Sequence, residues 1–171
     1  DEDGKPATSK PHMIFFDSGT KYAYVANVGA GTVTIIDVSQ REIVTTIPTG
    51  NGAHAAVPSP DDKRVYVVNM RDATITEILT DIEKGTFTVG RTIKVSEMMP
   101  LCAVFTNDSK KAYISAMGNL TASDPMSTGM MSVIDVESGM EVKTVGPLGK
   151  NGCGLFLSED GSKLFGNAGR P

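Results

Sequence analysis

Residues 24–55 read YVANVGAGTVTIIDVSQREIVTTIPTGNGAHA, in which short runs of β-branched residues alternate with clusters of Gly, Asn, Asp and Ser. Runs of this length and composition, bounded by turn-forming residues, are typical of β-strands. No long stretch of the sequence carries an apolar stripe with the roughly 3.6-residue period of an amphipathic helix. The sequence therefore predicts an all-β fold.

A strand, a polar turn and a second strand recur four times along the chain. If Tyr24, Tyr66, Tyr113 and Leu164 are taken as equivalent, the copies are 42, 47 and 51 residues apart. Repeats with such periods are typical of β-propeller blades, which are four-stranded antiparallel sheets. The copies are IFFDSGTKYAYVAN (14–27), AVPSPDDKRVYVVN (56–69), VFTNDSKKAYISA (104–116) and LFLSEDGSKLFGNA (155–168).

Each repeat is predicted to form one blade, and the first is expected to have strands at 12–16, 22–27, 32–38 and 42–48. The repeats amount to about three and a half blades, whereas propellers have roughly 4 to 8. An incomplete ring would leave two open sheet edges. We therefore expect part of a larger ring, completed by a longer chain or by a second chain. The expected boundaries are a flexible lead-in at 1–10, blades at 11–52, 53–100 and 101–152, and a partial blade at 153–171.

The first repeat resembles the YVTN-type β-propeller repeat. That repeat has a YVxN strand end, a short polar link, a VxVID strand, a TxxVxxTIxxG strand and then a Pro or small residue, and residues 24–55 contain each element in this order. The second repeat has EIL in place of VID, and the third has ISA where YVxN would end. The resemblance covers residues 11–171. It implies a propeller of seven or eight blades, of which this chain would form about half. Such propellers serve as binding platforms, envelope proteins or shells around redox cofactors.

The charge balance argues against nucleic acid as a partner. The chain has 16 basic and 20 acidic residues, a net charge of −4, and no basic cluster interleaved with aromatic residues. Its apolar runs are far shorter than the roughly 20 residues of a membrane-spanning helix. The polar start, DEDGKPATSK, lacks an initiator Met, as a processed or trimmed terminus would. Together with the resemblance, this leads us to expect a periplasmic, cell-surface or secreted protein.

Superposing the repeats places the only two histidines, His12 and His54, in one column with Leu101 and Gly152. This column marks the start of the innermost strand of each blade, at the mouth of the central channel. Histidines that converge there, with Cys102 or Met13 as a sulfur ligand, would suit copper, zinc or haem iron. The alternative is a polar channel lining without any cofactor. The sequence favours this alternative, because it has no HxH or CxxC spacing.

The next column holds Met13, Ala55, Cys102 and Cys153, and so contains both cysteines. Consecutive strand residues point to opposite faces. If the histidines face the channel, the cysteines are therefore expected in the packing between blades. Small buried thiols are common in protein cores, whereas a disulfide between them would need an oxidising compartment.

The third repeat carries an insertion at 117–130. Tyr113 and Asp135 are 22 residues apart, against 13 for Tyr24 and Asp37 in the first repeat. Lengthened loops on a rigid scaffold often carry binding, and thioethers can hold a soft metal or adapt to a protein partner. The alternative is a tolerated surface insertion. The candidate partner-binding residues are Met117, Asn119, Met126, Met130 and Met131.

These patterns lead to the hypothesis of an extracytoplasmic β-propeller that binds through its loop face and acts as a scaffold within a larger chain or complex. The alternative is a redox or electron-transfer propeller that holds copper or a haem-like cofactor at the channel mouth. No GxSxG, Walker, HExxH or GxGxxG motif occurs in a fitting context. No catalytic residue is therefore proposed, and enzymatic activity is left open.

Overall fold

The computed structural model describes residues 9–118, 129–147 and 153–167. In these ranges every regular element is a strand, so the all-β prediction is confirmed. Within the same ranges, no helix is long and apolar enough to cross a membrane. The strands are β1 (Pro11–Phe16), β2 (Tyr22–Asn27), β3 (Thr32–Asp37), β4 (Glu42–Pro48), β5 (Ala53–Pro58), β6 (Arg64–Asn69), β7 (Thr74–Asp81), β8 (Thr86–Lys94), β9 (Pro100–Phe105), β10 (Lys111–Ala116), β11 (Met131–Asp135), β12 (Met140–Val145), β13 (Leu155–Leu157) and β14 (Leu164–Gly166).

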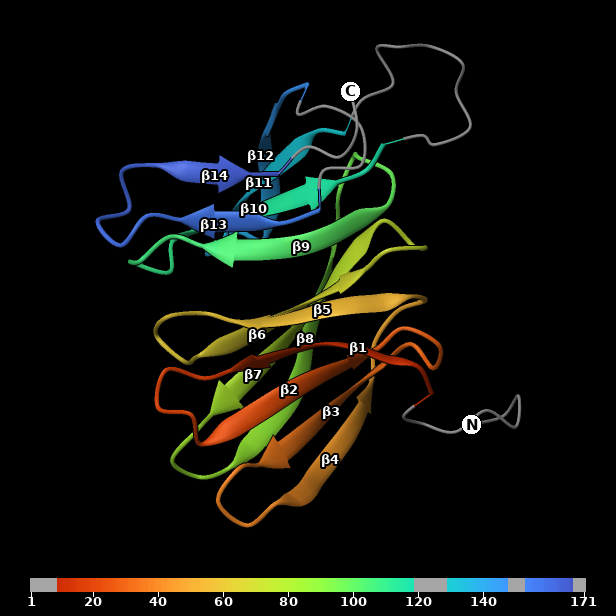
Figure 1. Ribbon diagram of the computed structural model, residues 1–171, viewed down its shortest axis with the longest axis vertical. Helices are drawn as coiled ribbons and strands as arrows, with labels where there is room; N and C mark the ends of the chain where they lie inside the picture. Colours follow the sequence, from red (N-terminus) through yellow and green to blue (C-terminus); the bar gives the residue numbers. More distant parts are fainter. Residues whose placement is uncertain (1–8, 119–128, 148–152, 168–171) are drawn as a thin grey trace.

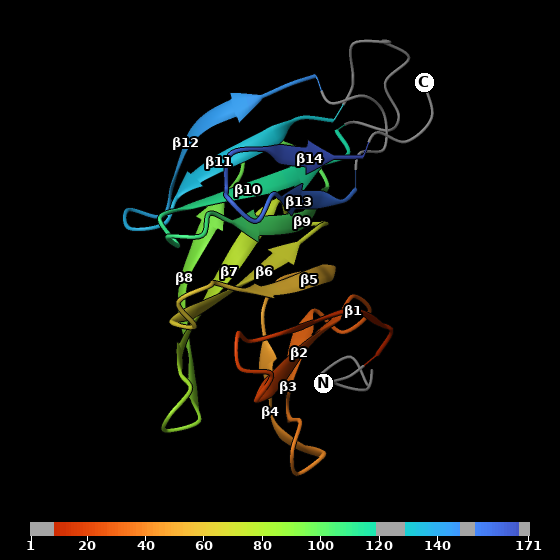
Figure 2. The same cartoon turned by 60° about the vertical axis from the view of Figure 1, so that its left-hand side comes forward.

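The strands form successive antiparallel sheets whose strands pair in chain order. The described residues give three sheets of four strands, β1 to β4, β5 to β8 and β9 to β12, and a two-stranded sheet of β13 and β14. The sheets are stacked face to face, and the first strands β1, β5, β9 and β13 follow one another along the inner side of the stack (Figures 1 and 2). This is the blade arrangement of a β-propeller. The predicted fold class is therefore confirmed.

Two apolar layers hold the first three blades together. Tyr24 and Ile35 of the first blade pack with Val67 of the second, and all three side chains are buried. Tyr66 of the second blade packs against Phe105 of the third, with ring centroids 4.8 Å apart. Burial of such apolar surface is the main favourable contribution to folding. The packing between blades therefore fixes how the inner strands stand relative to one another.

The hairpin turn between the first two strands is closed by one side-chain network in three of the described blades. In each, a hydroxyl donates to a carboxylate oxygen at 2.6 Å. The same carboxylate accepts a backbone N–H from two positions further along. These polar side chains satisfy the tight turn locally. The pairs are Ser59 with Asp61, Thr106 with Asp108, and Ser158 with Asp160.

The hairpin register corrects one expectation from the sequence. Phe156 pairs with Phe165 just as Val57 pairs with Tyr66 at the same distance from the turn. The equivalent of Tyr66 is therefore Phe165 and not Leu164, because the turn, rather than the strand-ending Asn167, sets the register of the fourth repeat.

This shift separates the two cysteines. Cys153 now falls in the column of His12 and His54, in the place that had been assigned to Gly152. Cys102 stays in the next column, where Gly154 is its counterpart in the fourth repeat.

Buried asparagines end the second strands of the first two blades. The Asn69 amide donates to the hydroxyl oxygens of Thr74 (3.1 Å) and Thr76 (2.9 Å), and its oxygen accepts the backbone N–H of Gly50 (3.0 Å). Asn27 makes the matching pair of bonds to threonine hydroxyls in the first blade. Asn69 therefore joins β7 to the link that leads out of the first blade.

A buried ionic cluster joins the second and third blades. Glu77 on β7 is 4% exposed and forms ion pairs with Arg64 (3.2 Å) and Arg91 (3.1 Å). Both guanidinium groups also donate to the backbone carbonyl of Val136, which directly follows β11. Glu77 pairs with Tyr66 as Ile35 pairs with Tyr24. The EIL departure from the repeat pattern thus places an acid where the first blade has an apolar residue.

Two apolar sheet faces lie uncovered at the ends of the described stack. On β1, Ile14 and Phe16 are 52% and 46% exposed, and on the last sheet Phe156 and Phe165 are 69% and 55% exposed. The first and last sheets lie at opposite ends of the row of inner strands (Figure 1). In a closed ring each face would pack against a neighbouring blade.

Candidate functional site

The candidate site is built on a β-bulge that recurs at the start of the innermost strand. On β5, the pairing with β6 skips His54, and on β9 the pairing with β10 skips Leu101. Over the matching stretch of the first blade, which contains His12, β1 has one residue more than β2. A bulge takes its extra residue out of the ladder and re-aims the side chain. We call the column of His12, His54, Leu101 and Cys153 the channel mouth.

The two histidines of the channel mouth contact each other. Their ring centroids are 4.1 Å apart and the ring planes are inclined by 40°. His54 is 7% exposed, whereas His12 is exposed. The sequence prediction that they share one position in adjacent blades therefore corresponds to a direct contact between one buried and one open imidazole.

The backbone of the third blade holds the His54 ring. His54 Nδ1 lies 2.7 Å from the carbonyl oxygen of Leu101. Because a carbonyl can only accept, Nδ1 carries the proton, and Nε2 of the neutral ring has a free lone pair. Burial lowers the pKa of His54 below its usual 6.5; the bond to Leu101 opposes this shift and nearby His12 adds to it. At pH 7 the ring is therefore neutral and can act as a ligand or as a base.

An apolar pocket of about 560 Å³ adjoins the channel mouth, lined by side chains from β1, β5, β9 and from the segment around β13. Three of its lining residues, Met13, Cys102 and Gly154, directly follow a residue of the channel mouth in the chain. The pocket is thus lined by the column that follows the channel mouth in the chain, and none of the four channel-mouth residues is among its described lining residues.

Methionines from separate segments come together near the start of β9. The backbone N–H of Met117 donates to the carbonyl of Met99 (3.1 Å), and that of Gly118 donates to the carbonyl of Met98 (3.1 Å). Met130 accepts from Ala116, and the neighbouring Met131 pairs with Ser115. Of the predicted partner-binding residues, Met117 directly follows β10 and Met130 directly precedes β11, whereas Met131 begins β11 and is buried. Asn119 and Met126 lie outside the described residues.

In the part of the chain that the structure describes, no three His, Cys, Asp or Glu side chains converge as a metal site. His12 and His54 are together, whereas Cys102 is buried in the adjacent column and lines the apolar pocket. Sequence reasoning did not include Cys153 among the candidate ligands, because its place in the histidine column depends on the register of the fourth hairpin. The Ser158–Asp160 turn, which repeats Ser59–Asp61, was the signal that could have shown it.

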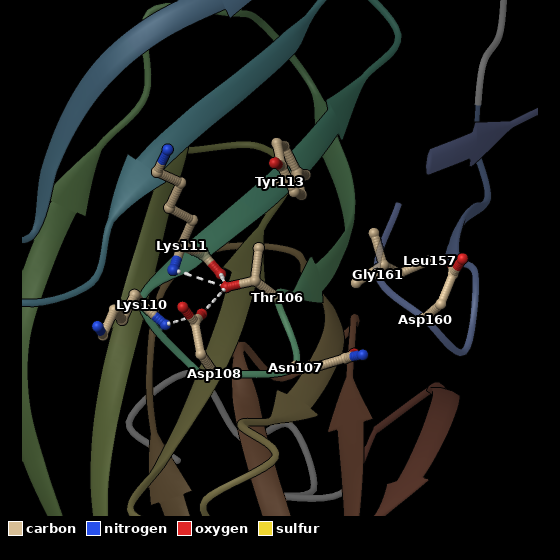
Figure 3. A pocket seen from close by; sticks show the side chains of 9 residues that line it. All are labelled: Thr106, Asn107, Asp108, Lys110, Lys111, Tyr113, Leu157, Asp160 and Gly161. Carbon is tan, nitrogen blue, oxygen red and sulfur yellow. Dashed lines mark hydrogen bonds between the residues drawn. The ribbon is translucent and has the colours of Figure 1, made fainter. Parts of the chain in front are cut away.

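A second pocket, of about 430 Å³, lies at the hairpin turns, away from the starts of the inner strands (Figure 3). Its polar groups are already engaged: Thr106 Oγ1 bonds to Asp108, and the backbone N–H groups of Lys110 and Lys111 complete the network. The ammonium groups of both lysines extend away from these bonds (Figure 3). Since the same network closes other blades, this pocket reflects turn structure, and the channel mouth is the stronger candidate.

Comparison with known proteins agrees with the fold. A family model described as lactonase, 7-bladed β-propeller, matches residues 2–134. No curated protein matches the sequence.

Three solved structures resemble the chain. A candidate 6-phosphogluconolactonase from Bacteroides fragilis has a TM-score of 0.70 and 16% identity over 92% of this chain and 47% of its own. A functionally unknown protein from Desulfotomaculum acetoxidans has a TM-score of 0.66 and 21% identity over 84% and 45%. Hydrazine synthase from Kuenenia stuttgartiensis has a TM-score of 0.55 and 15% identity over 94% and 56%. The chain thus spans about half the length of these structures, and the likeness concerns the fold alone.

Proposed function

Because the chain belongs to the lactonase family of seven-bladed β-propellers, we propose that it is a binding module that holds its ligand at the channel mouth. The contact between His12 and His54, at a bulge shared by adjacent inner strands, carries this proposal. The bulge takes the His54 imidazole out of the β5–β6 ladder, and the irregular start of β1 contains His12. The module belongs to a larger ring, and the open faces at Ile14 and Phe165 are where the remaining blades pack.

We place the module outside the cytoplasm, in the periplasm or at the cell surface. The resemblance of residues 24–55 to the repeat of envelope propellers supports this location. The exposed Met98 and the half-buried Met117 and Met130 near the start of β9 add an adaptable apolar rim for a protein partner, because thioether side chains repack easily against different surfaces.

The ligand class that best fits the channel mouth is a transition-metal ion, zinc or copper. Imidazole is a preferred ligand of both ions. Metal-binding histidines usually donate their other ring N–H to a carbonyl or carboxylate, and His54 makes that bond to Leu101. Two protein ligands leave room for water or for groups from the remaining blades in a tetrahedral site. A copper ion held in this way would also serve the redox role considered from the sequence.

Zinc binding tests the proposal. Zn²⁺ is titrated against a chromophoric chelator in a Cys102→Ser/Cys153→Ser background, so that the thiols do not compete. We expect one ion per chain, and at least about tenfold weaker binding in His54→Gln and in His12→Gln, because each variant removes one of two protein ligands. Asn51→Ala, an exposed change three residues from His54, is the matched control and should bind as the parent does. Equal affinity in both histidine variants and the parent would refute the site.

Lactone hydrolysis is the second candidate function, favoured by the family and by the state of His54. A neutral imidazole anchored through Nδ1 can take a proton from an attacking water through Nε2. Acid release from δ-gluconolactone, followed by pH-stat without added metal, should then exceed the spontaneous rate and fall by about 100-fold or more in His54→Gln. A rate equal to that of buffer would remove this candidate and leave the metal proposal intact.

A further inference from the structure

The two cysteines lie on neighbouring inner segments of the third and fourth blades. They are the only cysteines of the chain. Cys102 is on β9, Cys153 stands two residues before β13, and β9 and β13 pack side by side. Neither thiol takes part in the turn networks or is a ligand of the proposed metal site, although Cys153 stands in the channel-mouth column.

Ser115 brings the two cysteine backbones close together. Ser115 is the residue of β10 that pairs with Cys102, and its hydroxyl donates to the carbonyl oxygen of Cys153 at 2.9 Å. Ser115 therefore contacts both cysteines, because it pairs with Cys102 in the sheet and hydrogen-bonds to the backbone of Cys153. On the other side, the amide oxygen of Asn167 accepts the backbone N–H of Cys153 (3.1 Å), which fixes the segment before β13.

The surroundings of the thiols differ in a way that favours stepwise oxidation. Cys102 is 5% exposed, whereas Cys153 is half-buried and open to a reagent. Burial is the main cause that raises the pKa of the Cys102 thiol, and the nearby Cys153 raises it further. Cys153 is therefore the thiol that reacts first, and Cys102 the one that resolves.

We propose that Cys102 and Cys153 form a disulfide that ties the third blade to the fourth when the protein meets a disulfide oxidant. The Cys153 thiolate attacks one sulfur of the oxidant's disulfide bond, and that sulfur stays bonded to Cys153 as a mixed disulfide. The other sulfur of the oxidant leaves as a thiolate and takes up a proton. Cys102 then loses its proton and attacks Cys153 Sγ, and the second thiol of the oxidant leaves. Two protein thiols are thereby oxidised by two electrons, and the oxidant is reduced to two thiols.

The proposal depends on the proposed function only for where the oxidant comes from. A disulfide persists outside the cytoplasm and is rare inside it. The bond would close a loop that contains the rest of the third blade and its insertion, and would restrict the unfolded chain accordingly. Whether the bond forms in vitro is independent of metal binding and of lactone hydrolysis.

Oxidation of the purified, folded chain tests the proposal. Reduced protein is treated with oxidised glutathione, denatured in iodoacetamide and weighed intact. We expect a monomer that is lighter by two hydrogen atoms, takes up no alkyl group and yields a peptide pair linking Cys102 to Cys153. Its thermal midpoint should rise by about 4 to 16 °C over the reduced form.

The single variants Cys102→Ser and Cys153→Ser are the matched controls. Each keeps one thiol, so neither should form the internal bond or gain thermal stability on oxidation. Two alkylatable thiols after oxidation of the folded parent, or disulfide-linked dimers alone, would overturn the proposal. Because this readout uses neither zinc nor lactone, its failure is distinguishable from failure of the proposed function.

Discussion

Replacing Glu77 with leucine is expected to lower the free energy of unfolding by about 2 to 4 kcal/mol. The variant leaves two guanidinium groups without their shared carboxylate at the junction of the second and third blades. The Arg64 and Arg91 side chains are 22% and 35% exposed, so water screens part of their unpaired charge. The loss of stability is therefore smaller than in a fully buried cluster. Urea unfolding of the variant against the parent measures the effect.

Two further variants separate the cluster from simple packing. Glu83→Gln, in an exposed turn of the same blade, should change stability by less than about 0.5 kcal/mol. Replacing Glu77, Arg64 and Arg91 together with apolar residues should recover most of the loss, because no unpaired charge is then left behind. If Glu77→Leu is as stable as the parent, the cluster does not hold the blades together.

Replacing Asn69 with alanine should lower the free energy of unfolding by about 2 to 3 kcal/mol. The variant removes two bonds to threonine hydroxyls and leaves the backbone N–H of Gly50 without its acceptor. The backbone of Gly50 packs tightly against the Asn69 side chain, since a Cβ added to Gly50 would lie only 2.6 Å from the Asn69 amide. Thermal and urea unfolding of the variant check the value.

Alanine variants of Asn27 and Asn51 should lose less stability than Asn69→Ala, each for a different reason. Asn27→Ala should cost less than Asn69→Ala, because among the described residues the Asn27 side-chain oxygen has no hydrogen-bond donor to lose. Asn51→Ala, at an exposed position, should cost almost nothing. Equal losses at Asn27 and Asn69 would show that the bond to Gly50 contributes nothing.

Most of the fold could be predicted from the repeats. Strand limits follow from the turn residues, since Ser59 and Asp61 close a hairpin that recurs in other blades. Stacking the repeats was enough to bring His12 and His54 to one position. The repeats failed at the fourth blade, where Asn167 and the Ser158–Asp160 turn imply registers one residue apart and the turn prevails.

The details that give the site its chemistry could not be read from the sequence. A bulge is a property of pairing, and no residue type marks it at His54 or Leu101. The group that fixes the His54 ring is the Leu101 carbonyl, which any residue would supply. The EIL departure at Glu77 was visible, but its partner Arg91 lies on the next strand, within an irregular stretch of the pairing between β7 and β8.

The central claim is that the two histidines of the channel mouth act together as one ligand site. The most direct test is a long-range ¹H–¹⁵N correlation spectrum of the histidine rings at about pH 7, recorded in the Cys102→Ser/Cys153→Ser background with and without Zn²⁺. Only two rings contribute signals. We predict a neutral His54 with its proton on Nδ1, and zinc-dependent shifts of nitrogen signals from both rings. A His54 ring protonated on Nε2, or two rings that zinc leaves unchanged, would contradict the account.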